Sequence, residues 1–492
     1  MTHKRQNRIY IVGAGFAGVS IASEIRRKGI LGEVVAFLDD DPQKIGTRID
    51  GLPVLGPIED VASLLDRTPS DEALIAIPNA GRETLRRIYE VLEAAEFARI
   101  RILPAVSQII DGKAHLIQTR EIDPQDLLGR NPIQINLKES LSYLRHKRVL
   151  VTGAGGSIGS ELCRQLLSGG AERLYLFGHG ENSIYEIDRE LRILQEEGVG
   201  EKATIVPVVG ELQDPDYMHF ILRRLQADVV FHAAAYKHVP MMEENPVGAV
   251  QNNVFGTHNL LEAARSAGTK RFVLVSTDKA VNPVSVYGAS KRIAEDLVLA
   301  HNGHFGDYMV VRFGNVLGSR GSILPLFRKQ INKGGPITIT DPHSSRYFMT
   351  IPEASSLVLK SAGVGTGGNL YVLDMGEPLS IQELAEQMVR FYGYEPGTDI
   401  PFEYIGMRRG EKVQEHLHGC DEQVEPTEYP RISQIRGRYP HNGSLHELLD
   451  ELRPICFWDP EEPSVYRNRK SLKAALRRYV PSLKVPEHEP EY

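Results

Sequence analysis

Short apolar runs alternate with longer amphipathic stretches along the chain, and the first block of this alternation ends near residue 105. Its apolar runs begin at Arg8, Val34, Ala73 and Arg99. A helical pattern of apolar and charged positions fills residues 81–96, between the last two runs. Because strands that alternate with helices form parallel sheets, the pattern predicts an α/β domain over residues 1–105.

The second block is larger and predicts a second parallel sheet. Its apolar runs begin at Arg173, Thr204, Asp228, Arg271 and Tyr308. From about Gly321 the alternation loosens and Pro and Gly become more frequent, which indicates a smaller C-terminal lobe. We therefore predict a domain with this lobe over 147–470, a connector over 106–146 and a charged, Pro-rich peripheral tail over 471–492.

A glycine-rich turn opens the second block, between the strand that begins near Lys147 and a helical pattern. Gly153, Gly156 and Gly159 form GxxGxxG. Glycine permits the tight turn, lets backbone amides reach a pyrophosphate and lets the helix pack on the sheet. The N-terminus of that helix then faces the phosphates. The turn predicts a dinucleotide site in a Rossmann-like domain.

The first block carries a second glycine-rich turn, with Gly13, Gly15 and Gly18 in GxGxxG and Asp39 after the next strand. An acid at that place usually holds a ribose hydroxyl. No candidate catalytic groups follow within the block, so a working nucleotide site, a degenerate or regulatory one and a nucleotide-sensing scaffold all remain open. In the second block Gly178 replaces the acid, which leaves the choice between NAD and NADP open.

The composition excludes several classes of protein. The 492 residues are 41% hydrophobic and 25% charged, and the formal net charge is -7. These values predict a globular protein without a nucleic-acid partner. We find no apolar run long enough to cross a bilayer and no signal peptide. Because Cys163, Cys420 and Cys456 have neither disulfide nor metal spacing, we expect a cytoplasmic protein without a metal.

Tyr287 and Lys291 are four residues apart, so they would share one face of a helix. A free tyrosine has a pKa of about 10, and a nearby ammonium together with a cationic nicotinamide ring would favour the phenolate. Tyr287 would then accept a proton from a sugar hydroxyl while hydride leaves the same carbon, and Lys291 would hold the nicotinamide ribose. The pair follows a predicted strand, at the edge where α/β sheets bind ligands.

Asp278 and Lys279 follow the same predicted strand. A carboxyl and an amine side by side can serve as acid and base for an elimination. On a hexose oxidised at C4, Lys279 as a neutral amine would remove the acidic C5 proton, and protonated Asp278 would protonate the leaving C6 hydroxyl. Hydride returned to C6 completes a loss of water with no net redox change. On chemistry alone, an exposed ion pair of little energetic value accounts for these two residues equally well.

Several motifs resemble one bacterial family, in order along nearly the whole chain. They are REIDPQDLLGRNPIQI, VTGAGGSIGSELCRQL, LFGHGENSIYEI, FHAAAYKHVPMME, NNVFGT, STDKAVNP, RFGNVLGSRGSILPLF, TDPHSSRYFMTIPEA and GMRRGEKVQE. The chain is similar to the UDP-N-acetylglucosamine 4,6-dehydratases of the extended short-chain dehydrogenase/reductase superfamily, which serve capsule, exopolysaccharide and protein-glycan synthesis. The resemblance implies a lyase (hydro-lyase) that makes a UDP-4-keto-6-deoxy-N-acetylhexosamine from UDP-N-acetylglucosamine with NAD or NADP, and that assembles as a homo-oligomer.

The matching motifs imply the residues of the site. Thr277, Asp278 and Lys279 correspond to the family's active-site Thr-Asp-Lys, and Lys291 corresponds to its Lys. Tyr287 matches the short soluble members, whereas long membrane-anchored members often carry Met there, so retention or inversion at C5 stays open. The candidate cofactor contacts are Gly153, Gly156, Ser157, Ile158, Gly159, His179, Glu211, Ala233, Ala234, Ala235 and Lys291. The candidate substrate contacts are Lys237, Asn315, Arg320, Ser322, Arg346, Arg408 and Glu411.

Two further points follow from the resemblance. A UDP-sugar 4-epimerase is the alternative reaction, because it also needs Tyr287, Lys291 and a nicotinamide but has no need for Asp278 and Lys279. Arginines among the substrate contacts suit a UDP-sugar, because their planar fork makes paired bonds to phosphate. Long members of the family carry transmembrane helices ahead of the N-terminal domain, so we expect a cytoplasmic chain, or a membrane-associated one if it is a trimmed form of an anchored protein.

Overall fold

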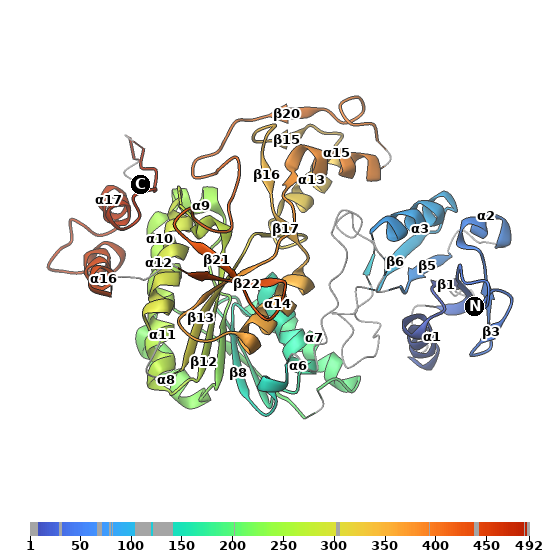
Figure 1. Cartoon of the computed structure of the whole chain (residues 1–492), viewed down its shortest axis with the longest axis horizontal. Helices are drawn as coiled ribbons and strands as arrows, with labels where there is room; N and C mark the ends of the chain where they lie inside the picture. Colours follow the sequence, from blue (N-terminus) through green and yellow to red (C-terminus); the bar gives the residue numbers. More distant parts are fainter. Residues whose placement is uncertain are drawn as a thin grey trace, which may run out of the picture. The chain divides into compact units, whose positions relative to one another are not determined.

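The chain folds into two compact units, each with a mainly parallel sheet and helices on its faces (Figure 1). One unit comprises Met1–Lys138 with Leu194–Val199, and the other comprises Glu139–Ile193 with Gly200–Tyr492. The predicted fold class is confirmed, whereas most of the predicted connector 106–146 lies outside the described residues. In this computed structural model the described residues are 8–28, 32–65, 71–77, 80, 82–103, 120–121, 141–200, 202–301, 306–392, 394–436, 442–486 and 488–489.

The first unit is built on one sheet. Its elements are β1 (Arg8–Val12), α1 (Phe16–Lys28), β2 (Glu33–Leu38), β3 (Arg48–Ile49), β4 (Leu52–Leu55), η1 (Ile58–Asp60), α2 (Val61–Leu64), β5 (Glu72–Ile75), α3 (Arg82–Ala94), β6 (Arg99–Ile102) and β7 (Arg120–Glu121). The strand order is β3-β4-β2-β1-β5-β6-β7, and β1 pairs in parallel with both of its neighbours. Consecutive residues from Ile9 to Val12 are buried, which is typical of a parallel strand covered on both faces.

The second unit is built on a larger sheet, whose strands run outward in both directions from β8 (Arg148–Thr152). On one side lie β9 (Arg173–Gly178) and β10 (Thr204–Val209), and on the other lie β11 (Val229–His232), β12 (Arg271–Thr277), β13 (Asp307–Phe313), β18 (Leu370–Leu373), β22 (Ile432–Arg436) and β21 (Gln423–Pro426). The pairs from β10 to β18 are parallel. Strand order reverses between β8 and β11, and open α/β sheets bind ligands beyond the carboxyl ends of the strands at such a point.

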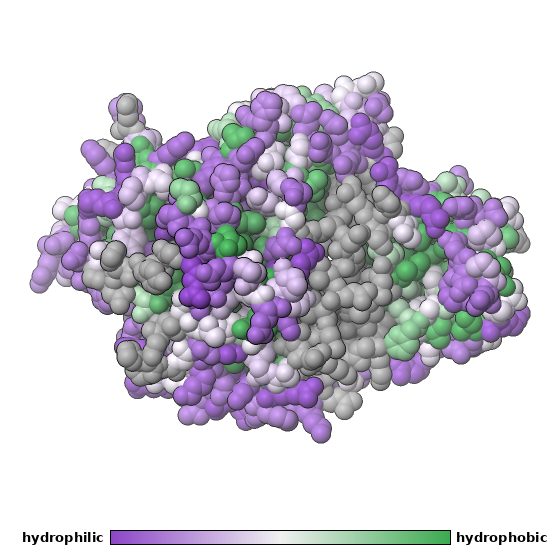
Figure 2. Space-filling model, viewed as in Figure 1, coloured by the Kyte–Doolittle hydropathy of each residue, from purple (hydrophilic) through white to green (hydrophobic). Residues whose placement is uncertain are grey.

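Helices cover both faces of this larger sheet (Figure 1). One face carries α8 (Pro215–Leu225), α9 (Val239–Glu244), α10 (Pro246–Val250), the π-helical η5 (Gln251–Phe255), α11 (Gly256–Ser266) and α12 (Val286–Ala300), and the other carries α6 (Ser157–Ser168), α7 (Glu181–Glu196) and α14 (Ile351–Val364). A continuous apolar core joins the strands to the first set of helices. The face drawn in Figure 2 is mostly hydrophilic, as burial of the apolar side chains in this core requires.

A smaller lobe follows in the C-terminal half, as the fold-class prediction stated. Its elements are α13 (Ile323–Ile331), β14 (Asn315–Val316), β15 (Ile337–Ile339), β16 (Ser345–Arg346), β17 (Phe348–Met349), β19 (Leu379–Ser380), α15 (Ile381–Phe391) and β20 (Phe402–Tyr404). α13 and α15 pack on β15, which pairs with β20. Figure 1 shows the lobe above the sheet of the second unit, so the lobe faces one edge of the strands.

The end of the chain differs from the predicted peripheral tail. Helices α16 (Asn442–Cys456) and α17 (Arg469–Tyr479) pack against each other and against α10 and α12. Leu472, Ala475 and Leu476 are fully buried in the main core. These apolar residues recur at helical spacing within a charged sequence, so burial of one helix face outweighs the polar composition that suggested a tail.

A buried arginine connects three segments of the second unit. Arg312 on β13 has no exposed side-chain surface, and its guanidinium lies 2.9 Å from the carboxylate of Glu295 on α12 and 2.8 Å from that of Glu422. It also donates a hydrogen bond to the backbone oxygen of Leu417. Glu295 and Glu422 are themselves almost completely buried. The charges of these two carboxylates and of Arg312 therefore stabilise one another in the interior.

Replacing Arg312 with methionine should therefore lower the free energy of unfolding by about 3–5 kcal/mol, because two buried carboxylates lose the cation that lies between them. Urea unfolding followed by circular dichroism measures the change. The matched control is Arg390→Met, since Arg390 is a half-exposed arginine whose ion pair with Glu386 is 3.8 Å long and should matter by less than about 0.5 kcal/mol. Equal stability of the two variants would contradict the expected cost of unpaired buried charge.

Candidate active site

The glycine-rich turn after β8 has the close approaches that the sequence predicts. Gly153 has φ +66°, and a Cβ there would lie 2.7 Å from the backbone nitrogen of Ala234. A Cβ on Gly159 would lie 2.1 Å from the carbonyl oxygen of Gly153. Gly156 is the N-cap of α6, which starts at Ser157. A side chain at Gly153 would thus push the turn away from the segment after β11, and one at Gly159 would push α6 away from the turn.

The other candidate cofactor residues lie at the same edge of the sheet. His179 directly follows β9, Glu211 lies just beyond β10, and Ala233–Ala235 directly follow β11. Because these strands are parallel and in register, their carboxyl ends meet at one edge. His179 and Glu211 are exposed, and the His179 ring stands edge-on to that of Tyr236 at 6.4 Å. Ile158 is the second residue of α6, so these candidates lie along the edge of the sheet where the parallel strands end.

Asp278 and Lys279 form a close contact at the end of the neighbouring strand. Thr277 ends β12 and caps η6 (Asp278–Ala280). The ammonium of Lys279 donates to Asp278 Oδ1 at 3.0 Å and to Asn315 Oδ1 at 2.9 Å. The Asp278 side chain is fully buried whereas that of Lys279 is about one-fifth exposed, at 21%. The pair is therefore no solvated surface ion pair.

The second oxygen of Asp278 lacks a hydrogen-bond partner in the part of the chain that the structure describes. A Cβ built on Gly314 would lie 3.1 Å from this Oδ2 atom, so the absence of a side chain at Gly314 keeps the approach to it free. A buried carboxylate oxygen without a partner is costly. An unsatisfied acceptor at this place is what an acid that hands its proton to a ligand requires.

Tyr287 and Lys291 lie one turn apart near the start of α12, with Ser285 as the N-cap. Both side chains are buried, and the Lys291 ammonium donates to the backbone oxygen of Val275 at 2.8 Å. Burial raises the pKa of Tyr287, a hydrogen bond with Thr277 opposes that rise, and the charge of Asp278 adds to it. Burial lowers the pKa of Lys291 to about 8. The structure thus brings Thr277 and both predicted acid/base pairs together.

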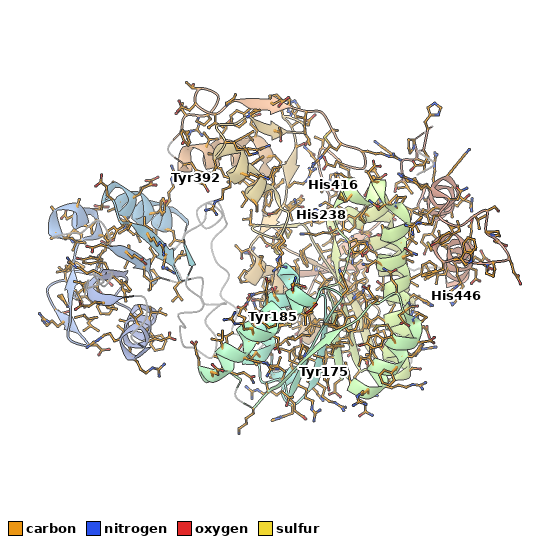
Figure 3. All side chains as sticks on the ribbon, turned by 180° about the vertical axis from the view of Figure 1, so that it is seen from behind. Tyr175, Tyr185, His238, Tyr392, His416 and His446 are labelled. Atoms are coloured by element: carbon orange, nitrogen blue, oxygen red, sulfur yellow. The ribbon has the colours of Figure 1, made fainter. Side chains whose placement is uncertain are left out.

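Lys237 adds a second ammonium near Lys279. Partial burial lowers the pKa of Lys237, and the charge of Lys279 lowers it further, although the side chain still reaches solvent. Its neighbour His238 lies where the edge of the sheet faces the lobe (Figure 3), and a Cβ on Gly321 would lie 2.4 Å from the His238 ring. Two neighbouring cations at one site favour loss of a proton from one of them.

The candidate substrate arginines have different surroundings. Arg346 donates to the backbone oxygens of Lys412 at 2.6 Å and Val413 at 2.7 Å, so its guanidinium holds the loop that follows Arg408. Arg408 is half-exposed and pairs with Glu411 at 2.6 Å. Arg408 and Glu411 therefore lie together, and Arg346 stabilises the loop that carries them through its hydrogen bonds to the backbone.

The remaining substrate candidates lie near the glycine-rich turn. Arg320 is largely exposed, pairs with Glu186 of α7 at 3.1 Å, and donates its backbone amide to the Ser157 hydroxyl at 3.1 Å. Ser322 is the N-cap of α13, and its buried hydroxyl has no hydrogen-bond partner within the described residues. Arg320 thus joins the lobe to the start of α6.

Sequence reasoning missed one carboxylate of the site. Glu415 is almost fully buried, and its carboxylate lies 4.0 Å from the ammonium of Lys279 and 3.3 Å from that of Lys412. Lys412 also donates to the backbone oxygen of Val281 at 2.7 Å. Glu415 ends the quoted GMRRGEKVQE motif, but nothing in its spacing indicates a contact with Lys279, because the two segments meet only in the folded chain.

The first unit has a glycine-rich turn of its own. Gly13 has φ +102°, and a Cβ on it would lie 3.1 Å from the backbone oxygen of Ala76. Asp39, predicted at the place that holds a ribose hydroxyl, accepts from the backbone nitrogen of Ala14 at 2.7 Å and from the ammonium of Lys44 at 3.2 Å. Burial raises the pKa of Asp39, but these hydrogen bonds and that of Asp41 lower it overall. The Asp39 carboxylate is thus already hydrogen-bonded to the glycine-rich turn and to the loop that follows β2.

Known proteins match both units. A family described as polysaccharide biosynthesis protein matches residues 149–437, and one described as CoA-binding domain matches residues 1–104. The chain belongs to the polysaccharide biosynthesis protein family. The family predicted from the motifs is therefore confirmed.

Proteins with similar sequences carry names of several kinds, and a Rickettsia prowazekii protein named "UDP-glucose 4-epimerase" is 30% identical over 57% of this chain and 80% of its own length. A Bacillus subtilis protein named "probable polysaccharide biosynthesis protein EpsC" is 42% identical over 87% of this chain and 71% of its own length. A Campylobacter jejuni protein named "UDP-N-acetylglucosamine 4,6-dehydratase (inverting)" is 31% identical over 56% of this chain and 78% of its own length.

A solved structure supports the fold of the second unit. The X-ray structure of Pen from Bacillus thuringiensis is 32% identical to this chain, with a TM-score of 0.53, and the match covers 61% of this chain and 90% of that one. Among the described residues of this polysaccharide biosynthesis protein, no helix is long and apolar enough to reach across a lipid bilayer.

Proposed function

We propose that the second unit is a nucleotide-sugar enzyme that converts UDP-N-acetylglucosamine to a UDP-4-keto-6-deoxy-N-acetylhexosamine by 4,6-dehydration. The observation that carries the proposal is the buried Asp278–Lys279 contact beside Tyr287 and Lys291. Transfer of hydride at one carbon needs only the Tyr-Lys pair. A buried acid/base contact next to that pair is costly to maintain and marks a functional site. The 31% identical dehydratase of Campylobacter jejuni supports the same reaction.

The residues at the switch point fit a dinucleotide such as NAD or NADP. Gly153 and Gly159 leave the turn without side chains, so its amides and the N-terminus of α6 are available to a pyrophosphate. The ammonium of Lys291 on α12 reaches the backbone of Val275 near the carboxyl end of β12, where it would hold the nicotinamide ribose. When bound, the nicotinamide supplies the hydride chemistry, acceptance at C4 and return at C6, and every proton step falls to side chains of the protein.

The proton steps divide between the two pairs. The Lys291 ammonium stabilises Tyr287 as the phenolate, which accepts the proton of the C4 hydroxyl as that carbon becomes a ketone and so becomes a neutral phenol. The C4 ketone acidifies the C5–H bond, so the neutral amine of Lys279 can remove that proton. Asp278 then gives a proton to the C6 hydroxyl, which leaves as water while the C5–C6 double bond forms.

The 3.0 Å contact between Lys279 and Asp278 explains how the second pair is prepared. Transfer of one proton from the Lys279 ammonium to the Asp278 carboxylate gives the neutral amine and the protonated acid that the elimination needs. After the elimination, Lys279 carries the C5 proton and Asp278 is ionised. Lys279 gives a proton back to C5 as C6 receives hydride, and the proton that Tyr287 took from the C4 hydroxyl then restores the Lys279 ammonium and the phenolate.

The reaction can be tested directly on the purified protein. Incubation with UDP-N-acetylglucosamine and NAD or NADP should give a product lighter by the mass of one water, detected by mass spectrometry. In heavy water, NMR should show deuterium at C5, because the C5 proton passes through Lys279. An unchanged mass with an altered C4 configuration would instead identify the alternative, a UDP-sugar 4-epimerase. An unchanged substrate with both cofactors would contradict either enzyme.

A further inference from the structure

A cluster of five charged residues lies outside the acid/base site and has no role in the steps above. Lys473 and Arg469 of α17 both lie 2.9 Å from Oε1 of Glu489, near the end of the chain. Lys473 also lies 3.2 Å from Glu243 at the end of α9. Arg409 is ion-paired with both Glu489 and Glu243. The cluster joins the end of the chain, α17, α9 and the 408–412 loop.

The cluster is buried, so its charges depend on one another. The side chain of Lys473 is completely buried, and those of Glu243 and Glu489 are 3% and 4% exposed. Three cations surround two carboxylates. Removal of the Glu489 charge would leave a single carboxylate for three cations, and uncompensated buried charge drives neighbouring groups apart or toward solvent. Arg409 is the cation with the freedom to leave, because a third of its side chain is exposed.

Two contacts connect this cluster to the proposed active site. Glu243 Oε1 accepts from the backbone nitrogen of Val286, the residue before Tyr287, at 2.7 Å. Gly410, which follows Arg409, has φ +78°, and a Cβ on it would lie 2.9 Å from that of Ser285. The start of α12 and the loop that carries Arg408 and Glu411 are therefore held against each other beside the cluster.

We propose that Glu489 is a positioning residue for the nucleotide subsite: its carboxylate holds Arg409, and Arg409 holds the 408–412 loop against the start of α12. The inference rests on the proposed function for the identity of the ligand, a uridine diphosphate group. Glu489 itself touches neither the acid/base residues nor the loop's Arg408–Glu411 pair in the described contacts. It acts on the site through Arg409.

The test measures the affinity of the whole protein for UDP by calorimetry. Glu489→Gln should weaken UDP binding by about tenfold, and Arg409→Gln should do the same. The double variant should lose no more than either single one, because both act through one contact. Glu461→Gln is the matched control, since Glu461 is an exposed glutamate of the same C-terminal segment, and it should bind UDP like the unmodified protein.

The outcomes separate this inference from the proposed function. Failure of the unmodified protein to bind UDP would overturn both. Normal UDP affinity in Glu489→Gln with only a lower unfolding temperature would show a purely structural role and overturn the inference alone, as would additive losses in the double variant. If the variants do not fold, the unmodified protein still provides a test. In it, UDP should slow amide hydrogen exchange at Val286 as well as in residues 408–412. Exchange that slows in the loop alone would overturn the coupling.

Discussion

Replacing Lys279 with methionine should lower the rate of dehydration by about a thousandfold and leave cofactor binding unchanged. Methionine keeps the length of the side chain but has no group that can take the C5 proton. The residue stands at the carboxyl end of β12, with contacts to Asp278 and Asn315. Product formation measured by mass spectrometry reports the loss, and calorimetry with NAD and NADP reports the binding.

The same variant distinguishes the two reactions that the fold allows. Oxidation at C4 needs Tyr287 and Lys291 only, so Lys279→Met should still reduce a stoichiometric amount of cofactor, seen as the near-ultraviolet absorbance of the reduced nicotinamide. Lys333→Met, which changes an exposed lysine of the lobe, is the control and should turn over normally. Dehydration that continues in Lys279→Met would remove this residue from the mechanism.

Replacing Tyr287 with phenylalanine should lower the overall rate by about a hundredfold to ten-thousandfold, because no other described group is placed one helical turn before Lys291 to accept the C4 hydroxyl proton. The ring and its burial are kept, so the free energy of unfolding should change little. In contrast to Lys279→Met, a single turnover of Tyr287→Phe should show almost no reduced nicotinamide.

The burial of Tyr287 determines which protonation state the ligand-free site holds. It raises the pKa of Tyr287, so the ligand-free site holds a neutral phenol, and the positive charges of Lys291 and of a bound nicotinamide must favour the phenolate. Tyr394→Phe is the matched control, since Tyr394 is a half-exposed tyrosine of the lobe and should behave like the unmodified protein. Reduction of the cofactor at the normal rate by Tyr287→Phe would assign the C4 proton to another acceptor.

Features that depend on neighbours in the sequence were predictable. The glycines of the turn after β8, the four-residue spacing of Tyr287 and Lys291, and the adjacency of Asp278 and Lys279 need only local geometry and the rule that parallel strands end at one edge. The structure places all of them along the edge of the larger sheet where its parallel strands end.

Contacts between distant segments were not predictable in the same way. Glu415 meets Lys279, and Glu489 meets Arg409, only because the lobe and the end of the chain fold back to the sheet. The error over the tail had a different cause. Composition suggested a solvated segment, but Leu472 and Leu476 recur at helical spacing, and that periodicity carried more information than the count of charges.

The ion cluster around Arg312 also limits how the protein can open and close around a ligand. Separation of Glu422 from Arg312 would leave uncompensated charges in the interior. A hinge motion at Glu422 would therefore meet a barrier of several kcal/mol. Domain closure, if ligand binding drives it, must bend the chain on the lobe side of Glu422. In a comparison of liganded and ligand-free crystal structures, we therefore expect Arg312, Glu295 and Glu422 to keep their positions while α13 and α15 move.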